Sequence, residues 1–290
     1  MGERKAKSRT RTAILAAEPR CIYCSGAPET VEHMPSISMF RGNDRPSTME
    51  YAACRACNNG TRGSDAVAAV IARLHPDNGE NSWQSEEMRK LISALDAQAP
   101  GVREELSLPG KARNELLRRP ASGLLQRVVL VHADGPRLKA HLGIYGAKLA
   151  MALYREHVGA ALPLDGAVWC QFALNAGMTQ EILNDRLKIL PMHETLRQGK
   201  KSVGNQFDYR FNCDGRTTMA AVVQFHRGLW FTLFASSDQR IIDIFCQPEV
   251  AKVPASLMVR PGELRGLLPP PLFNVRGGAP LKNTSALPDG

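Results

Sequence analysis

The residues of this chain that are best suited to chemistry lie close together near its N-terminus. Four cysteines form two Cys-x-x-Cys pairs, Cys21 with Cys24 and Cys54 with Cys57. Two thiolates separated by two residues can reach one tetrahedral ion from a tight turn, and four thiolates close its coordination sphere. The spacing therefore predicts a structural zinc (Zn²⁺) site and no open position for catalysis at that ion.

A redox dithiol is the alternative interpretation of each pair, but the surrounding sequence lacks the βαβ pattern that accompanies such motifs. Three further cysteines are isolated in apolar or strand-like stretches, where we expect buried free thiols: Cys170, Cys213 and Cys246. Disulfides are rare in the cytoplasm, and we expect this chain to be cytoplasmic.

An acid–histidine dipeptide, Glu32–His33, lies between the two cysteine pairs. Adjacent side chains on a strand leave it on opposite faces, so one can hold a metal while the other faces substrate or water. Asn58 follows Cys57 directly, where a helix is expected to begin, and its carbonyl oxygen suits Mg²⁺. A surface dipeptide and a helix cap are the simpler interpretations of these residues. Their placement within the cysteine frame favours hydrolytic chemistry.

The order Cys-x-x-Cys, Glu-His-x-x-Pro, Cys-x-x-Cys-Asn over residues 21–63 resembles the HNH endonuclease family in its zinc-stapled branch. The resemblance implies two antiparallel strands and a helix around one metal, the ββα-metal or His-Me finger. It implies that Glu32 and Asn58 hold a catalytic divalent ion, Mg²⁺ or Mn²⁺. It also implies that His33 is the general base that takes a proton from water, and that the four cysteines bind the structural zinc.

The chain departs from the family pattern at two places. The family's middle asparagine, five residues before the third cysteine, is replaced by Met49, and Asn43 is the candidate substitute. A lysine often found three residues after the final asparagine is replaced by Thr61, with Arg62 beside it. The main alternative to a nuclease is therefore a non-catalytic zinc module that binds nucleic acid or protein.

The charge of the chain is consistent with a nucleic-acid partner, for which we expect DNA. Its formal net charge is +9, and its first twenty residues are strongly basic. A solvated tail is the alternative interpretation of that basic segment. Four arginines near the motif are candidates for contacts to the phosphate backbone: Arg41, Arg45, Arg55 and Arg62. No apolar run reaches the length of a membrane helix, so no membrane partner is expected.

The sequence divides into a basic tail (1–13), a zinc-binding module (14–63), a larger α+β domain (64–268) and a Pro/Gly-rich tail (269–290) that we expect to be disordered. The module is too poor in apolar runs to build a core alone, which favours a metal staple. The larger domain carries no nucleophile–base pair or phosphate loop. Its role is open, and setting specificity or forming a homodimer are the alternatives.

Hydrophobic spacing predicts an α+β fold with antiparallel strands. Helices are expected over 64–75, with Ser64 as N-cap, and over 83–98, 136–159 and 179–190. Strands are expected over 125–133 and 167–175, and three strands over 205–237 with turns at Asp214–Gly215 and Arg227–Gly228. His75 precedes a proline at a helix end and is expected to be a C-terminal cap. The remaining histidines have no partner at ligand spacing and are expected to be structural or exposed: His132, His141, His157, His193 and His226.

Overall fold

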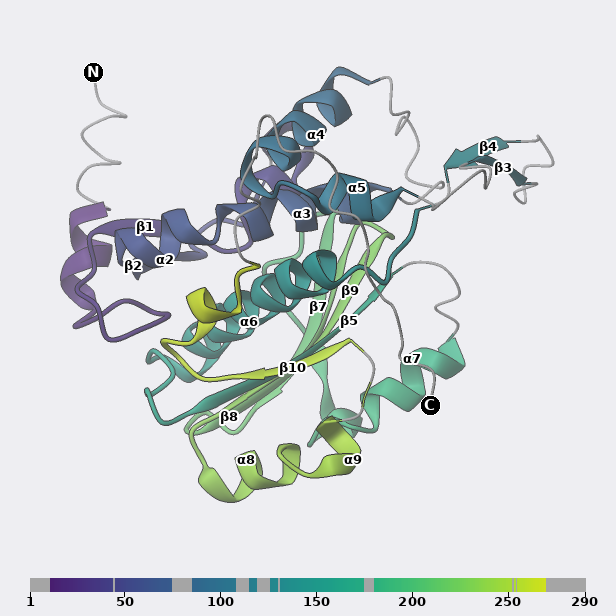
Figure 1. Cartoon of the computed structure of the whole chain (residues 1–290). Helices are drawn as coiled ribbons and strands as arrows, with labels where there is room; N and C mark the ends of the chain where they lie inside the picture. The colour runs from purple at the N-terminus through teal and green to yellow at the C-terminus, as the bar shows by residue number, and fades with distance from the viewer. Residues whose placement is uncertain are drawn as a thin grey trace, which may run out of the picture.

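The computed structural model of the chain describes residues 11–43, 45–74, 85–107, 115–118, 126–129, 131–174, 180–251, 253 and 255–269. Helices and antiparallel sheets are both present, so the predicted α+β fold is confirmed (Figure 1). Among the described residues, no helix is long and apolar enough to span a membrane.

The N-terminal part has the predicted order of two strands and a helix. Strand β1 (Thr30–His33) pairs antiparallel with β2 (Glu50–Ala53), and α2 (Arg55–Gly60) follows directly. The loop between the strands contains two short 3-10 turns, η1 (Ile37–Met39) and η2 (Arg41–Asn43). Figure 1 shows this unit at the edge of the molecule, beside the helices of the larger part.

A helical layer connects this unit to the central sheet. It contains α3 (Arg62–Arg73), α4 (Glu86–Gln98), α5 (Val102–Leu106) and the long α6 (Pro136–Val158). Helix α3 packs against both α4 and α6, so almost all of its residues are buried. The hydrophobic core is continuous from the cysteine turn to the end of the larger part.

The central sheet has six strands, and every neighbouring pair is antiparallel. Its order is β10 (Ser256–Val259), β5 (Ala167–Leu174), β9 (Leu229–Ser236), β8 (Thr218–Phe225), β7 (Phe207–Cys213) and β6 (Arg197–Gln198). The predicted alternation of β7 is confirmed, because Phe207, Tyr209 and Phe211 are buried while their neighbours are more exposed.

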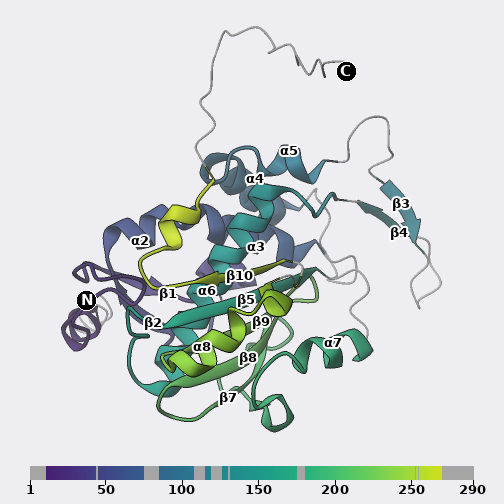
Figure 2. The same cartoon turned by 60° about the horizontal axis from the view of Figure 1, so that its bottom comes forward.

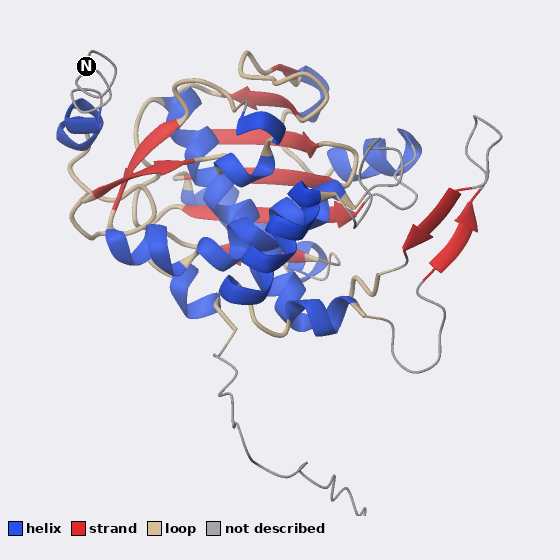
Figure 3. Cartoon of the chain, turned by 90° about the horizontal axis from the view of Figure 1, so that it is seen from above, coloured by secondary structure: helices blue, strands red, loops and turns tan. Residues whose placement is uncertain are grey.

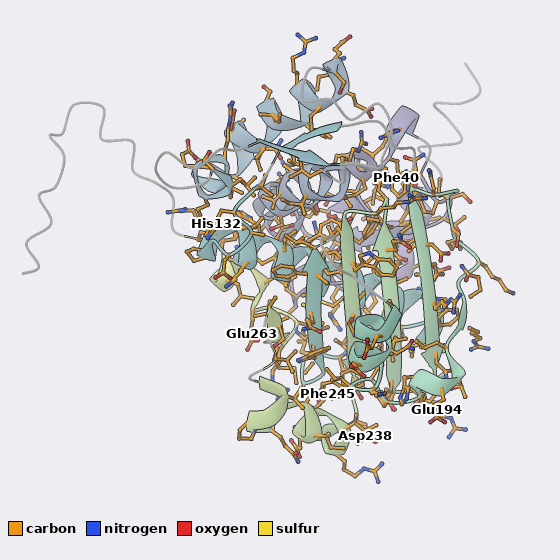
Figure 4. The ribbon with its side chains drawn as sticks, turned by 90° about the vertical axis from the view of Figure 1, so that its right-hand side faces the viewer. Phe40, His132, Glu194, Asp238, Phe245 and Glu263 are labelled. Atoms are coloured by element: carbon orange, nitrogen blue, oxygen red, sulfur yellow. The ribbon has the colours of Figure 1, made fainter. Side chains whose placement is uncertain are left out.

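Helices cover both faces of the sheet. Helix α6 packs on β5, β8 and β9 from one side. On the other side lie α8 (Gln239–Phe245), α9 (Pro248–Ala251) and α7 (Gln180–Leu187), as Figure 2 shows. There Phe245 stacks on Phe234 with ring centroids 3.9 Å apart, and both pack beside Trp169. Figure 4 places Phe245 near one end of the strands and Phe40 near the other.

Three shorter elements complete the description. The η3 turn (His193–Thr195) precedes β6, and η4 (Leu264–Leu267) contacts α2 and α6. A separate hairpin of β3 (Glu115–Arg118) and β4 (Gln126–Val129) projects away from the sheet, as seen in Figure 3.

Both ends of α6 follow from its sequence. Pro136 occupies the first helical position, where its missing N–H costs nothing. The carboxylate of Glu105 accepts hydrogen bonds from the backbone N–H groups of Arg137 (3.0 Å) and Leu138 (3.1 Å), which satisfies donors that have no helical partner. Gly159 ends the helix with a left-handed φ of 91°. The predicted helix over 136–159 is therefore confirmed.

Several details differ from expectation. Helix α3 begins at Arg62 after Thr61, so Ser64 lies inside the helix and bonds to His141 instead of capping it. Of the three isolated cysteines, Cys170 is buried as predicted, whereas Cys213 is half-buried and Cys246 is exposed. Strands β3, β6 and β10 and helices α8 and α9 were not expected from the sequence pattern. His75 and most of the C-terminal tail lie outside the described residues.

Candidate functional site

The four paired cysteines converge on one point. Cys21 and Cys24 lie in the turn before β1, Cys54 caps α2, and Cys57 lies in the first turn of that helix. Their four Sγ atoms all lie within 4.8 Å of one another. The sulfurs of a tetrahedral zinc–tetrathiolate site are about 3.8 Å apart, from a Zn–S bond of about 2.3 Å. Two of the separations here are 3.5 and 3.6 Å, so the cluster could bind a metal such as zinc.

Backbone amides point at three of these sulfurs, although burial raises the pKa of Cys24. The N–H groups of Tyr23, Gly26 and Cys57 donate to the sulfurs of Cys21, Cys24 and Cys54, each at 3.3 Å. The Cys57 thiol donates a hydrogen bond that lowers the pKa of Cys21 to about 5, while burial acts in the opposite direction. Donors aimed at a sulfur stabilise its charged form, which is the form that binds metal.

A cavity of about 800 Å³ opens beside the cysteine cluster. Its walls come from the segment before β1, from β1 and β2 and the loop between them, from α2, and from the start of α3. Its polar lining includes Arg11, Thr30, His33, Arg45, Glu50, Asn58 and Arg62. Arginine outnumbers glutamate in this lining, and the cavity therefore favours an anionic ligand.

His33 reaches this cavity from the end of β1. It pairs across the hairpin with Glu50, and its Nδ1 atom lies 3.5 Å from Glu50 Oε1. Burial lowers the pKa of His33 below its ordinary value, Arg45 lowers it further, and Glu50 opposes both effects. A histidine with a lowered pKa is neutral at pH 7 and can accept a proton.

Asn58 reaches the same cavity from α2. Its Nδ2 atom donates to Thr30 Oγ1 at 3.0 Å and to the carbonyl oxygen of Val31 at 3.2 Å. Both amide protons are therefore directed at β1, which fixes the plane of the carboxamide and leaves Oδ1 as the atom available to a ligand. His33 and Asn58, which the sequence predicted to share a site, both line this cavity.

Glu32 lies on the opposite face of β1 and does not line the cavity. Its carboxylate is 3.1 Å from Nζ of Lys148 on α6, and Lys148 also binds Asp65 at 2.8 Å. Burial raises the pKa of Glu32 to about 7, although the positive charge of Lys148 lowers it. The expectation that Glu32 and Asn58 hold one ion does not fit this geometry, because adjacent strand residues point to opposite sides.

The candidate arginines separate into two groups. Arg45 and Arg62 line the cavity, whereas Arg41 and Arg55 do not. Arg45 donates to the carboxylate of Glu50, so its charge is already shared with that residue. The cavity lining also includes Arg11, which belongs to the basic N-terminal segment and was not among the four candidate arginines.

Met49 fills the core and carries no polar contact to the site. Its side chain is 1% exposed, and its carbonyl oxygen accepts from the backbone N–H of Met34 at 3.3 Å. The side chain of Asn43, the candidate substitute, lies outside the description. The polar residue that meets His33 is instead the next one, Glu50, and it was missed because only the strand register reveals it.

The site thus joins a cluster of four sulfurs, suited to holding a soft ion, with a separate cavity that contains an imidazole and an oriented carboxamide oxygen. An imidazole can accept a proton, and a carboxamide oxygen can bind a hard cation. No protein-family model matches this chain, and no curated protein or solved structure matches it either.

Proposed function

We propose that this protein is a metal-dependent endonuclease of the HNH type that hydrolyses phosphodiester bonds in DNA. The single observation that carries the proposal is the placement of His33 and Asn58 in one arginine-lined cavity beside the cysteine cluster. In this proposal the four cysteines hold a structural zinc ion, which fixes the turn before β1 against the first turn of α2.

His33 acts as the general base. Its neutral imidazole accepts a proton from the attacking water, for which the lowered pKa is suitable. A bound divalent ion, Mg²⁺ or Mn²⁺, would supply polarisation of a phosphoryl oxygen and stabilisation of the leaving oxygen. Oδ1 of Asn58 is the protein oxygen placed to hold it, and Mg²⁺ commonly takes its other ligands from water and substrate phosphates.

The arginines supply attraction to the backbone of the substrate. Arg11 and Arg62 line the cavity, and neither forms an ion pair with Glu50, the carboxylate of the same lining. Two guanidinium groups near an imidazole can hold a phosphate by forked hydrogen bonds. Binding through such contacts weakens as salt concentration rises, because phosphate contacts release counterions.

The decisive experiment compares cleavage by the wild type and matched variants of the full chain. Supercoiled plasmid, linear duplex, single-stranded DNA and RNA are incubated with Mg²⁺ or Mn²⁺. We expect DNA cleavage that requires the divalent ion, is lost in His33→Ala and needs more ion in Asn58→Ala. His193→Ala is the control, because His193 lies outside the cavity and binds the Leu190 carbonyl. Cleavage that persists in His33→Ala contradicts the assignment.

One observation favours a second candidate, a non-catalytic zinc module that binds nucleic acid. The carboxylate of Glu32 is turned away from the cavity, so the oxygen ligands there are fewer than the family pattern implies. Under this alternative the cavity binds a phosphate of the backbone but does not hydrolyse it. Salt-sensitive DNA binding without cleavage on any substrate would establish this alternative and remove the first proposal.

A further inference from the structure

Glu50 lies opposite His33 in the β1–β2 hairpin. The backbone register pairs these two residues, and Oε1 of Glu50 is 3.5 Å from Nδ1 of His33. Nδ1 is buried, and among the described residues it has no formed hydrogen bond. Buried ring nitrogens normally find a partner, and Glu50 is the side chain already aligned with this one.

We propose that Glu50 is the positioning residue of His33, accepting a hydrogen bond from Nδ1–H so that Nε2 is the proton-accepting atom. The role as a base rests on the proposed nuclease function, whereas the Glu50–His33 interaction itself does not. A small closure of the observed distance forms the bond, and catalytic hydrogen bonds are often long before a substrate binds.

The strand pairing makes this contact specific. Four consecutive residue pairs fix the register of β1 on β2, from Thr30 with Ala53 to His33 with Glu50. A shift by one residue would place Glu50 on the opposite face of the hairpin. The hairpin in turn is held by the cysteine turn and α2, so the orientation of the imidazole depends on the metal cluster through the backbone.

Arg45 binds the same carboxylate oxygen that faces His33. It donates to Oε1 of Glu50, and its side chain is only 18% exposed. The same guanidinium disfavours Glu50 as a ligand of the divalent ion, because a cation beside the carboxylate reduces its attraction for a second positive charge. Arg45 and His33 therefore share one carboxylate oxygen of Glu50, and this carboxylate holds the neutral imidazole in one tautomer.

The first test reads the tautomer directly and needs no activity. The zinc-loaded full chain is labelled with ¹⁵N in its histidine rings, and the His33 signals are assigned with His33→Gln. We expect Nδ1 of His33 to carry the proton in the wild type and in Glu29→Gln, and the proton to move mainly to Nε2 in Glu50→Ala. Glu29 is the matched control, because it lies in the same module and its carboxylate accepts from the backbone N–H of Arg55 and does not line the cavity.

The second test reads the consequence for catalysis, with plasmid DNA and saturating Mn²⁺. We expect Glu50→Ala to lower kcat at least about tenfold with little change in KM, and to have no further effect in a His33→Ala background.

Three results overturn the proposal. The first is a wild type in which His33 carries its proton on Nε2, and the second is a His33 tautomer that does not change in Glu50→Ala. The third is a Glu50→Ala variant whose kcat is restored by a higher Mn²⁺ concentration, which would make Glu50 an ion ligand. A wild type that cuts nothing refutes the nuclease function alone, and the tautomer still decides the role of Glu50.

Discussion

Glu32 on β1 and Lys148 on α6 form an ion pair of 3.1 Å in which neither side chain is more than 3% exposed. Asp65 on α3 completes the cluster at 2.8 Å from the same Nζ atom. Burial alone would lower the pKa of Lys148, but the two carboxylates raise it above its ordinary value. The strand that carries His33 is thereby held against α6, so the larger part of the chain helps to place the candidate site.

We expect Lys148→Met to destabilise the protein by about 3–5 kcal/mol, the usual cost of removing one partner from a buried charge cluster. The substitution leaves the carboxylates of Glu32 and Asp65 without their shared cation. Urea unfolding of the full chain measures the effect. Lys90→Met is the control, because Lys90 is 75% exposed and should change stability by less than about 0.5 kcal/mol.

The same variant should respond to pH in a defined direction. Burial raises the pKa of Glu32 in the folded protein, so the folded state retains a proton that the unfolded state has released. Stability from such a group is lost as the pH rises, and the deficit of Lys148→Met should be larger at pH 8 than at pH 5. Adding Glu32→Gln and Asp65→Asn to Lys148→Met should recover part of the lost stability. A small, pH-independent deficit would contradict the role of the cluster.

The cysteine cluster predicts one tightly held zinc ion per chain. Elemental analysis of the purified protein should find it, and a strong chelator should lower the midpoint of thermal unfolding, because metal binding is linked to folding of the module. Cys54→Ser should reduce both the zinc content and the stability. Cys246→Ser should change neither, because Cys246 is exposed and lies outside the cluster. A stable, zinc-free wild type would refute the assignment.

Local signals made the cysteine cluster and α6 predictable from the sequence. Ligand spacing depends on residues a few positions apart, and the same is true of Pro136 and Gly159 at the ends of the helix. The pairing of Glu50 with His33 needed the register of two strands, which the loop between them does not reveal. The pairing of Glu32 with Lys148 could not be predicted from the sequence, because Lys148 is distant along the chain and has the pattern of an ordinary helical lysine.

The short elements were missed for a related reason. Strand β10 (Ser256–Val259) and helices α8 and α9 are short. Packing on the sheet stabilises them more than their intrinsic strand or helix propensity does. Ser64 shows that the start of a helix is equally hard to place from the local sequence. It has the chemistry of a cap, but the turn at Thr61 begins the helix earlier and leaves its hydroxyl for His141.

We expect the protein to lose stability as the pH falls from about 6.5 toward 4, and His141 to contribute to this loss. Burial, followed by the charge of Arg137, lowers the pKa of His141 to about 4. Between the unfolded and folded values the unfolded chain binds a proton that the folded chain does not, so acid favours unfolding. The loss at pH 5 relative to pH 6.5 should be smaller in His141→Gln by up to about 1.5 kcal/mol.

Urea unfolding across this pH range provides the measurement. His132→Gln is the control, because the side chain of His132 is exposed and the variant should follow the wild-type curve. A His141→Gln curve parallel to that of the wild type would show that the buried histidine does not titrate in this window.

Gly146 sets the distance between α6 and the sheet, and Gly146→Ala tests that packing. A Cβ at this position would lie 2.9 Å from Phe231 and 3.3 Å from Cys170. Helix propensity favours alanine by about 1 kcal/mol, but overpacking against a ring costs about 1–3 kcal/mol, so we expect a net loss of stability. Gly143→Ala is the matched comparison, because the nearest atom to its Cβ would be the flexible end of Leu257, at 3.0 Å. Equal or higher stability of Gly146→Ala in urea unfolding would contradict the close approach of the helix to β5 and β9.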